Sequence, residues 1–190
     1  MATRSNSAAA LFTLSALDTN KIKIGELGAI QPLIDLLEQG SPAGKKDAAS
    51  AVFNLCMAHE NRVRAVNEGA VGIVLKTISN NTLVDESLSI LAMLSSNTDA
   101  LEEIGLLGGV PLLLSILKES SCARNKENAL VVLFSICMYD RSKLREVGEE
   151  ENLNATISHL AHNGTSRARR KAAGILDKLR RTTHITHYSC

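Results

Sequence analysis

The chain has 190 residues, of which 45% are apolar and only 3% aromatic, and its formal net charge is +1. This length and apolar content allow one continuous buried core and exclude disorder for most of the chain. The small net charge gives no overall field that favours nucleic acid, and no apolar run reaches the ~20 residues of a membrane-spanning helix. We therefore expect a folded protein without a nucleic-acid partner and without a membrane span.

The four cysteines are far apart in the sequence. Cys56 and Cys137 each follow the last apolar residue of a helical pattern, so we expect both thiols to be buried in helices. Buried single cysteines favour a reducing, intracellular setting over a disulfide framework. We therefore expect a cytoplasmic and/or nuclear protein.

The first elements in chain order are helical. Residues 5–17 form an amphipathic pattern, and a short helix with Ile22 and Ile24 follows and ends near Gly28. Gly28 permits a sharp turn, and Pro32 is tolerated only in the first turn of the next helix. Glycine and proline within residues 39–44 predict a loop before a long helix at 44–56.

This unit recurs along the chain. The last apolar residues of five similar segments are Leu14, Leu55, Leu94, Ile136 and Leu179, which are separated by 41, 39, 42 and 43 positions. A period near forty predicts a stacked array of helical repeats. We expect the third helix of a truncated repeat at 1–17, complete repeats at 18–57, 58–95 and 96–138, a C-terminal capping repeat at 139–181, and a flexible tail at 182–190.

The last repeat departs from the pattern. Residues 149–152, Glu-Glu-Glu-Asn, stand where the other repeats have a glycine turn. Asp177 stands where Phe12, Phe53 and Phe134 occupy a position that we expect to be buried. A polar residue there is typical of a terminal repeat with no neighbour on that side.

Three helices in about forty residues, with Gly-Ala-Ile at 28–30 and Gly-Ala-Val at 69–71 in the first turn, resemble armadillo repeats. HEAT repeats are the nearest alternative, but they have two main helices and lack this glycine turn. The resemblance covers nearly the whole chain. It implies an all-α fold, a right-handed α-solenoid of armadillo repeats.

Several segments also resemble the armadillo region of plant U-box proteins. They are NKIKIG at 20–25, GAIQPL at 28–33, GSPAGKKDAA at 40–49, NRVRAV at 61–66 and GTSRARRKA at 164–172. In that family a U-box recruits a ubiquitin-charged E2 enzyme, and the armadillo array binds a substrate or a regulatory protein. The resemblance implies that this chain, in which we find no U-box, is the substrate-recognition part of an E3 ubiquitin ligase. The alternative is a non-catalytic armadillo scaffold or adaptor in signalling.

The resemblance also indicates where a partner would bind. Third helices line the concave face of such a solenoid, and peptide-binding armadillo proteins use an Asn and an earlier Trp on them. Asn54 keeps the Asn, whereas no repeat keeps the Trp, which argues against a transport receptor for nuclear localisation peptides. The expected partner-binding residues are Lys45, Lys46, Ser50, Asn54, Asp85, Ser89, Met93, Glu127, Val131, Ser135, Arg170 and Lys178.

A second basic cluster lies near the end of the chain. It contains Arg167, Arg169, Arg170, Lys171, Lys178, Arg180 and Arg181. Such a cluster is typical of a solvated capping helix, because cations suit a helix C-terminus. A nuclear localisation signal and a site for an acidic partner are the alternatives.

No catalytic motif is recognisable, and we expect no cofactor. His184, His187 and Cys190 have a spacing that could ligate zinc, but three ligands on a terminal segment fit a flexible tail better.

Overall fold

The computed structural model describes residues 2–186, with the side chains of residues 3–182. Every regular element in this range is an α-helix. The chain forms two compact units, unit 1 (Met1–Glu103) and unit 2 (Ile104–Cys190), and the division falls inside α8 (Thr98–Leu106). Residues 187–190 lie outside the described residues, and so does the side chain of His184. The histidine and cysteine spacing that could ligate zinc, and the last residues of the tail that we expected to be flexible, therefore lie outside them as well.

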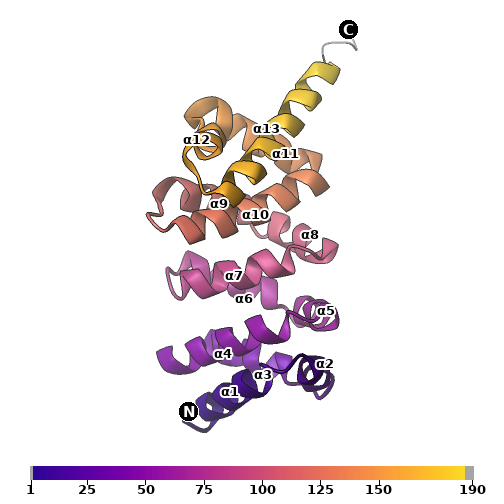
Figure 1. Ribbon diagram of the computed structural model, residues 1–190, viewed down its shortest axis with the longest axis vertical. Coiled ribbons are helices and arrows are strands. Elements are labelled where there is room, and N and C mark those ends of the chain that lie inside the picture. Colours follow the sequence, from indigo (N-terminus) through magenta and orange to yellow (C-terminus); the bar gives the residue numbers. More distant parts are fainter. Residues whose placement is uncertain (1, 187–190) are drawn as a thin grey trace. The chain divides into compact units, whose positions relative to one another are not determined.

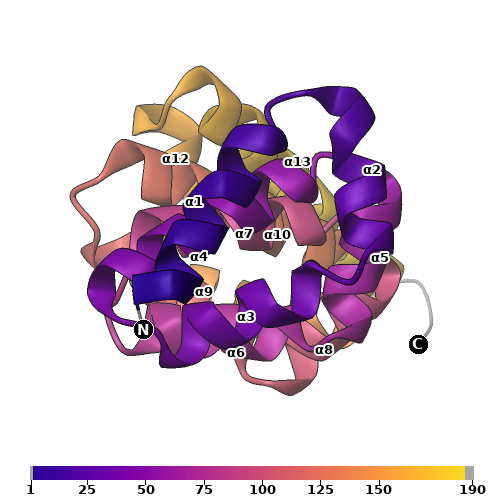
Figure 2. The same cartoon turned by 90° about the horizontal axis from the view of Figure 1, so that it is seen from below.

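Unit 1 consists of one helix followed by helix triplets. Its helices before α8 are α1 (Ala2–Leu14), α2 (Asp18–Glu26), α3 (Ile30–Gln39), α4 (Pro42–Leu55), α5 (His59–Asn67), α6 (Ala70–Ser79) and α7 (Val84–Leu94). Helices at the same position in successive triplets pack on one another: α1 on α4, α4 on α7, α2 on α5 and α3 on α6 (Figures 1 and 2). The repeat in the sequence is therefore a repeat in packing.

Unit 2 follows the same rule. After the end of α8 it contains α9 (Gly109–Glu119), α10 (Ala123–Tyr139), α11 (Arg141–Asn154), α12 (Thr156–Asn163) and α13 (Ser166–Thr186). The third helices α10 and α13 pack together, and α9 packs on both α10 and α12 (Figure 1). The helix α13 runs to Thr186, past the boundary that we expected at residue 181.

Apolar positions at helical spacing build the core. In α4 the fully buried residues include Ala48, Ala49, Val52 and Leu55, and the corresponding stripe of α13 contains Ala168, Ala172 and Ile175. Cys56 and Cys137 are buried, as expected, and burial raises the pKa of both thiols to about 12. A thiol with so high a pKa forms little thiolate near neutral pH and is a poor nucleophile.

The turn between the first and second helix of a triplet needs a left-handed residue. Gly28, Gly69 and Gly108 supply it, with φ of +77°, +79° and +73°. In the last triplet the expectation for residues 149–152 was wrong, because these residues continue α11 as a helix. The turn lies at Ala155 instead, which adopts φ 52° and ψ 32° at the start of α12.

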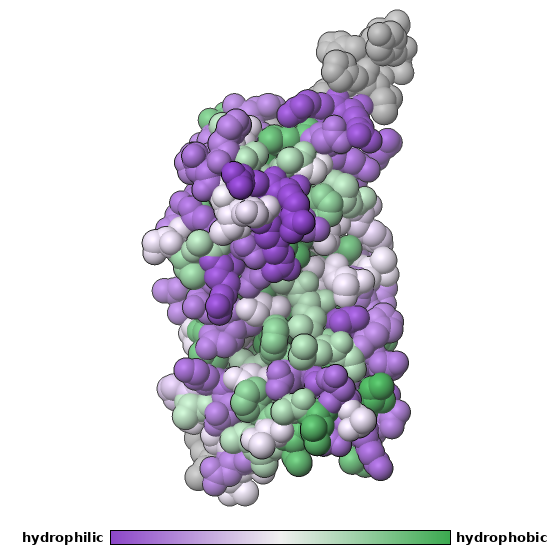
Figure 3. Space-filling model, viewed as in Figure 1, coloured by the Kyte–Doolittle hydropathy of each residue, from purple (hydrophilic) through white to green (hydrophobic). Residues whose placement is uncertain are grey.

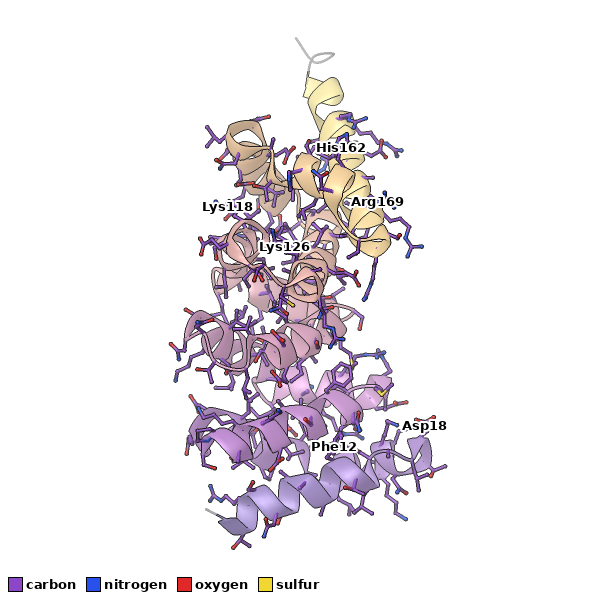
Figure 4. The ribbon with its side chains drawn as sticks, turned by 60° about the vertical axis from the view of Figure 1, so that its left-hand side comes forward. Phe12, Asp18, Lys118, Lys126, His162 and Arg169 are labelled. Atoms are coloured by element: carbon purple, nitrogen blue, oxygen red, sulfur yellow. The ribbon has the colours of Figure 1, made fainter. Side chains whose placement is uncertain are left out.

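The phenylalanines were also expected to be buried, and this was wrong. Phe53 and Phe134 are only half-buried, and Phe12 on α1 is 43% exposed (Figure 4). Their position lies at the edge of the buried stripe of each third helix, not at its centre.

Helix starts differ from expectation by a few residues. The helix α4 begins at Pro42 and not at Gly44, because the Ser41 side chain caps it by accepting a hydrogen bond from the Gly44 N–H at 3.2 Å. Pro42 fits the first helical position, where no donor is needed.

None of the described helices alone is long and apolar enough to cross a membrane, whereas α8 and α9 pass that test as a bent pair, on length and composition only.

Candidate functional site

The expected binding residues of α4 form one stripe. Lys46, Ser50 and Asn54 are spaced by four residues, so they lie on the same side of the helix, and all three are at least partly exposed. The Ser50 hydroxyl donates to the Lys46 carbonyl at 3.0 Å within the helix. Lys46 and Asn54 therefore supply the charge and the amide of this stripe.

A matching stripe lies on α7, which packs against α4 in unit 1. Asp85, Ser89 and Met93 have the same four-residue spacing and are at least partly exposed. The Ser89 hydroxyl donates to the Asp85 carbonyl at 2.8 Å. Unit 1 thus brings a basic and an acidic helix start together on adjacent third helices.

Lys45, which was also expected to bind a partner, contacts a neighbouring helix of the fold. Its ammonium donates a hydrogen bond of 2.7 Å to the Glu38 carbonyl near the end of α3. A cation suits the carbonyl end of a helix, because the helix dipole is negative there. Lys45 therefore stabilises the junction between α3 and α4, and its charge is not directed to the stripe of Lys46.

The expected residues of α10 lie in unit 2 and differ in accessibility. Val131 is only 9% exposed, whereas Ser135 is half-buried and donates to the Val131 carbonyl at 3.2 Å. Glu127 is engaged with the start of α13: it accepts a hydrogen bond from the Thr165 hydroxyl and pairs with Arg167 at 3.2 Å. Glu127 therefore fixes one helix against the next.

The basic residues of α13 divide into paired and outward groups. Arg181 pairs with Asp177 at 2.7 Å, and Lys171 places its ammonium 4.0 Å from the centre of the Phe134 ring. The expected binding residues Arg170 and Lys178 are exposed and half-buried, respectively. Neither forms a hydrogen bond or ion pair among the described residues.

Asn61 was missed as a key residue by the sequence reasoning. It is fully buried, and its side-chain amide donates to the carbonyls of Lys21 at 2.7 Å and Leu55 at 3.0 Å. Its side-chain oxygen accepts from Arg64 at 3.0 Å. The Asn61 side chain comes so close to α2 that a Cβ on Gly25 would lie 1.8 Å from its oxygen. Asn61 thus joins α2, α4 and α5.

The pKa shifts of three carboxyl groups, those of Glu38, Glu68 and Glu103, arise from their local surroundings in the fold. A hydrogen bond from Lys76 lowers the pKa of the Glu38 carboxyl, whereas burial raises the pKa of Glu68 and Glu103. Within the described part of the chain no group of three or more His, Cys, Asp or Glu side chains is placed to hold a metal ion.

Comparison with known structures shows the fold. A designed armadillo repeat protein, 20% identical, has a TM-score of 0.79 over 92% of this chain and 75% of its own. Another designed armadillo repeat protein, solved in complex with the peptide (KR)4, is 18% identical with a TM-score of 0.75, covering 92% of this chain and 74% of its own. These similarities confirm the expected all-α armadillo solenoid.

Comparison with known sequences points to relatives in plants. The model of the armadillo/beta-catenin-like repeat matches residues 18–57, which contain α2, α3 and α4. U-box domain-containing protein 9 of Arabidopsis thaliana is 59% identical over 98% of this chain and 41% of its own length. Putative U-box domain-containing protein 46 of the same plant is 46% identical over 94% of this chain and 40% of its own. The chain thus spans about two fifths of these curated relatives. The chain thus has the armadillo-repeat fold, and its sequence is similar to those of plant U-box domain-containing proteins.

Proposed function

We propose that this chain is the protein-recognition part of a U-box E3 ubiquitin ligase. The observation that supports the proposal most strongly is the 59% identity to a U-box domain-containing protein over 98% of this chain. The exposed stripes of the third helices, with Lys46 and Asn54 on α4 and Asp85 on α7, provide a surface for a substrate or a regulatory protein. A cytoplasmic or nuclear location belongs to this proposal.

An E3 ligase of this type does no covalent chemistry through its recognition part. It holds the substrate beside a ubiquitin-charged E2 enzyme, which would bind a U-box elsewhere in the full-length protein. Holding both together raises the effective concentration of the acceptor lysine at the E2 thioester. The recognition part therefore determines which protein is modified.

A competition assay tests this proposal. The full-length natural protein is incubated with E1, E2, ubiquitin and a substrate captured by the chain 1–190. Excess chain 1–190 should suppress ubiquitination of that substrate, because it occupies the recognised segment. Self-ubiquitination of the full-length ligase should continue, because the E2 site is untouched.

Failure to form any ubiquitin conjugate with the full-length protein would contradict the ligase proposal. Capture of a partner without conjugates would instead support the alternative, a non-catalytic armadillo scaffold in signalling. An inactive E2 variant serves as the control for conjugates formed by contaminating ligases.

A further inference from the structure

We propose that the exposed face shared by α10 and α13 binds an acidic, extended protein segment. This inference, which rests on the function proposed above, names the chemical class of partner for the part of the surface that lies in unit 2. We call this face the α13 basic face. It consists of Arg170, Lys171 and Lys178 on α13 together with Val131, Phe134 and Met138 on α10.

The helix α13 carries a much larger net positive charge than the chain as a whole. Between Arg167 and Arg181 this helix carries seven Lys and Arg residues and one acidic residue, Asp177, whereas the whole chain has a net charge of only +1. Strongly hydrophilic residues accordingly gather over α13 in Figure 3. Net positive charge concentrated on one helix creates a local field that attracts anionic partners.

The nearby carboxylates of Asp177 and Glu127 are each paired with a single arginine of α13 and do not neutralise its other cations. Asp177 pairs with Arg181 at 2.7 Å, and Glu127, the acidic residue of α10, is held by Arg167 and Thr165. Arg169, which is labelled in Figure 4, and Arg170 remain exposed. Neither forms a hydrogen bond or ion pair among the described residues. The described part of α13 therefore presents exposed cations that an anionic partner can contact.

The face also has an apolar strip. Val131, Phe134 and Met138 follow one another at helical spacing on α10, with Val131 nearly buried and the other two half-buried. The ring of Phe134 reaches α13 because residue 174 is glycine: a Cβ there would lie 2.6 Å from the ring carbon Cε2. The Lys171 ammonium lies over the same ring at 4.0 Å. The Lys171 ammonium thus lies at the edge of this apolar strip.

The positions on α13 form a line. Arg167, Lys171, Gly174 and Lys178 recur at spacings of four, three and four, which places them on the flank that meets α10. A segment that lies along this flank would meet cations at residues 167, 171 and 178, with Gly174 between the last two. An extended segment with alternating acidic and apolar residues fits both the charges and the apolar strip.

The same features favour a protein over a nucleic acid or a lipid surface. Binding of single-stranded nucleic acid uses aromatic rings that are free to stack, whereas Lys171 covers Phe134. A helix that lies on a membrane needs an outward apolar face, whereas Ala168, Ala172 and Ile175 of α13 are buried in the fold.

The experiment measures fluorescence anisotropy of labelled peptides with the chain 1–190. The acidic probe is a peptide of about ten residues that alternates Glu and Leu, and the basic probe is (KR)4. We expect the acidic probe to bind at least about tenfold tighter than the basic probe. We also expect its affinity to fall when NaCl rises from about 50 mM to about 500 mM, because salt screens exposed charges.

Two double variants with the same change in charge locate the site. R170E with K178E should weaken binding of the acidic probe by about tenfold or more. R141E with R145E, which reverses two exposed arginines of α11 in the same unit, should change it by less than about twofold. Circular dichroism of both variants checks that they remain folded.

Several results would overturn the inference: equal binding of the two probes, equal losses in the two double variants, or tighter binding to oligo(dT) or to vesicles with about 30% phosphatidylserine than to the acidic probe. The two proposals can fail separately. If the substrate is still ubiquitinated by R170E/K178E full-length protein at the normal rate, only this inference fails. If no conjugates form with any variant, the ligase proposal fails, while peptide binding still decides the inference.

Discussion

Consecutive helix triplets are joined by different chemistry in the two units. In unit 1 the buried side-chain amide of Asn61 on α5 donates to the carbonyl of Lys21 on α2 and to that of Leu55 on α4. In unit 2 the junction of α10 with α13 uses an ion pair between Glu127 and Arg167 and a cation over the Phe134 ring. One junction is neutral and buried, and the other is charged and partly exposed.

This difference means that one junction contributes mainly to stability, whereas the other also contributes charged groups at the surface. Hydrogen bonds of a buried amide are not screened by salt, and losing the amide removes two donated hydrogen bonds from a buried site. Exposed ion pairs contribute little stability, typically about 0–1 kcal/mol, but they keep charged groups at the surface. We therefore expect the α2–α5 junction to act mainly in folding, whereas the α10–α13 junction can also serve binding.

The largest expected effect comes from Asn61→Ala. This change removes both donated hydrogen bonds in a buried site, so we expect the free energy of unfolding of unit 1 to fall by about 2–4 kcal/mol with little dependence on salt. The measurement is iodoacetamide labelling with mass spectrometry. Labelling of Cys56, which is buried beside Asn61, should accelerate much more than labelling of Cys137 in unit 2.

Asn20→Ala is the matched control for this prediction. Asn20 has the corresponding position on α2, but its amide makes one exposed hydrogen bond, to the Leu14 carbonyl at 3.0 Å. The expected loss is about 0.5–1 kcal/mol. If both alanine variants cost the same, or if Cys137 labelling rises as much as Cys56 labelling, the role assigned to the Asn61 junction is wrong.

A smaller effect with two opposite signs is expected for Glu127→Gln. Loss of the ion pair with Arg167 should lower the free energy of unfolding by about 0.5–1 kcal/mol at low salt, and less at high salt. Removal of this negative charge should also tighten binding of the acidic probe by about two- to threefold. Urea unfolding and peptide anisotropy measure the two effects.

A purely structural role of Glu127 would change only the unfolding free energy. Glu119→Gln, which neutralises an exposed glutamate at the end of α9, provides the control for charge alone. Equal tightening in both variants would show that net charge, and not the position of Glu127, controls binding.

Much of the fold could be predicted from the sequence because it repeats. Apolar residues at helical spacing and glycines at 28, 69 and 108 determine where the helices lie and where the chain turns. The destinations of polar side chains were less predictable. Lys45 and Glu127 were expected to face a partner, and the structure shows that each contacts a neighbouring element of the fold, which the sequence did not reveal. A long charged side chain has several partners within reach, and only the folded structure selects one.

Asn61 left a signal in the sequence that a single repeat does not reveal. Asn20 and Asn61 occupy the same position in consecutive repeats, and each amide donates to the last residue of the preceding third helix, Leu14 or Leu55. An asparagine before a helix is commonly a cap, so its recurrence is informative only once the period is known. The sequence cannot show that Asn61 also reaches across to α2.

The turn between α11 and α12 was mispredicted because the Glu151 side chain stabilises it and no glycine marks it in the sequence. Glu151 lies within α11, and its carboxylate accepts hydrogen bonds from the N–H groups of Ile157 at 2.6 Å and Ser158 at 3.1 Å. These bonds satisfy free donors at the start of α12. They hold the turn at Ala155, a non-glycine residue that must adopt a left-handed backbone conformation here.

The one expected gain in stability therefore comes from Ala155→Gly. A left-handed alanine costs about 1–2 kcal/mol, and the greater freedom of glycine in the unfolded chain offsets about half of the relief. We expect the free energy of unfolding of unit 2 to rise by about 0.5–1 kcal/mol, measured by urea unfolding and by slower labelling of Cys137. The same substitution inside α12, Ala161→Gly, should lower it by a similar amount, because glycine is unfavourable within a helix. Destabilisation by both substitutions would show that the backbone at Ala155 is not the strained point of this turn.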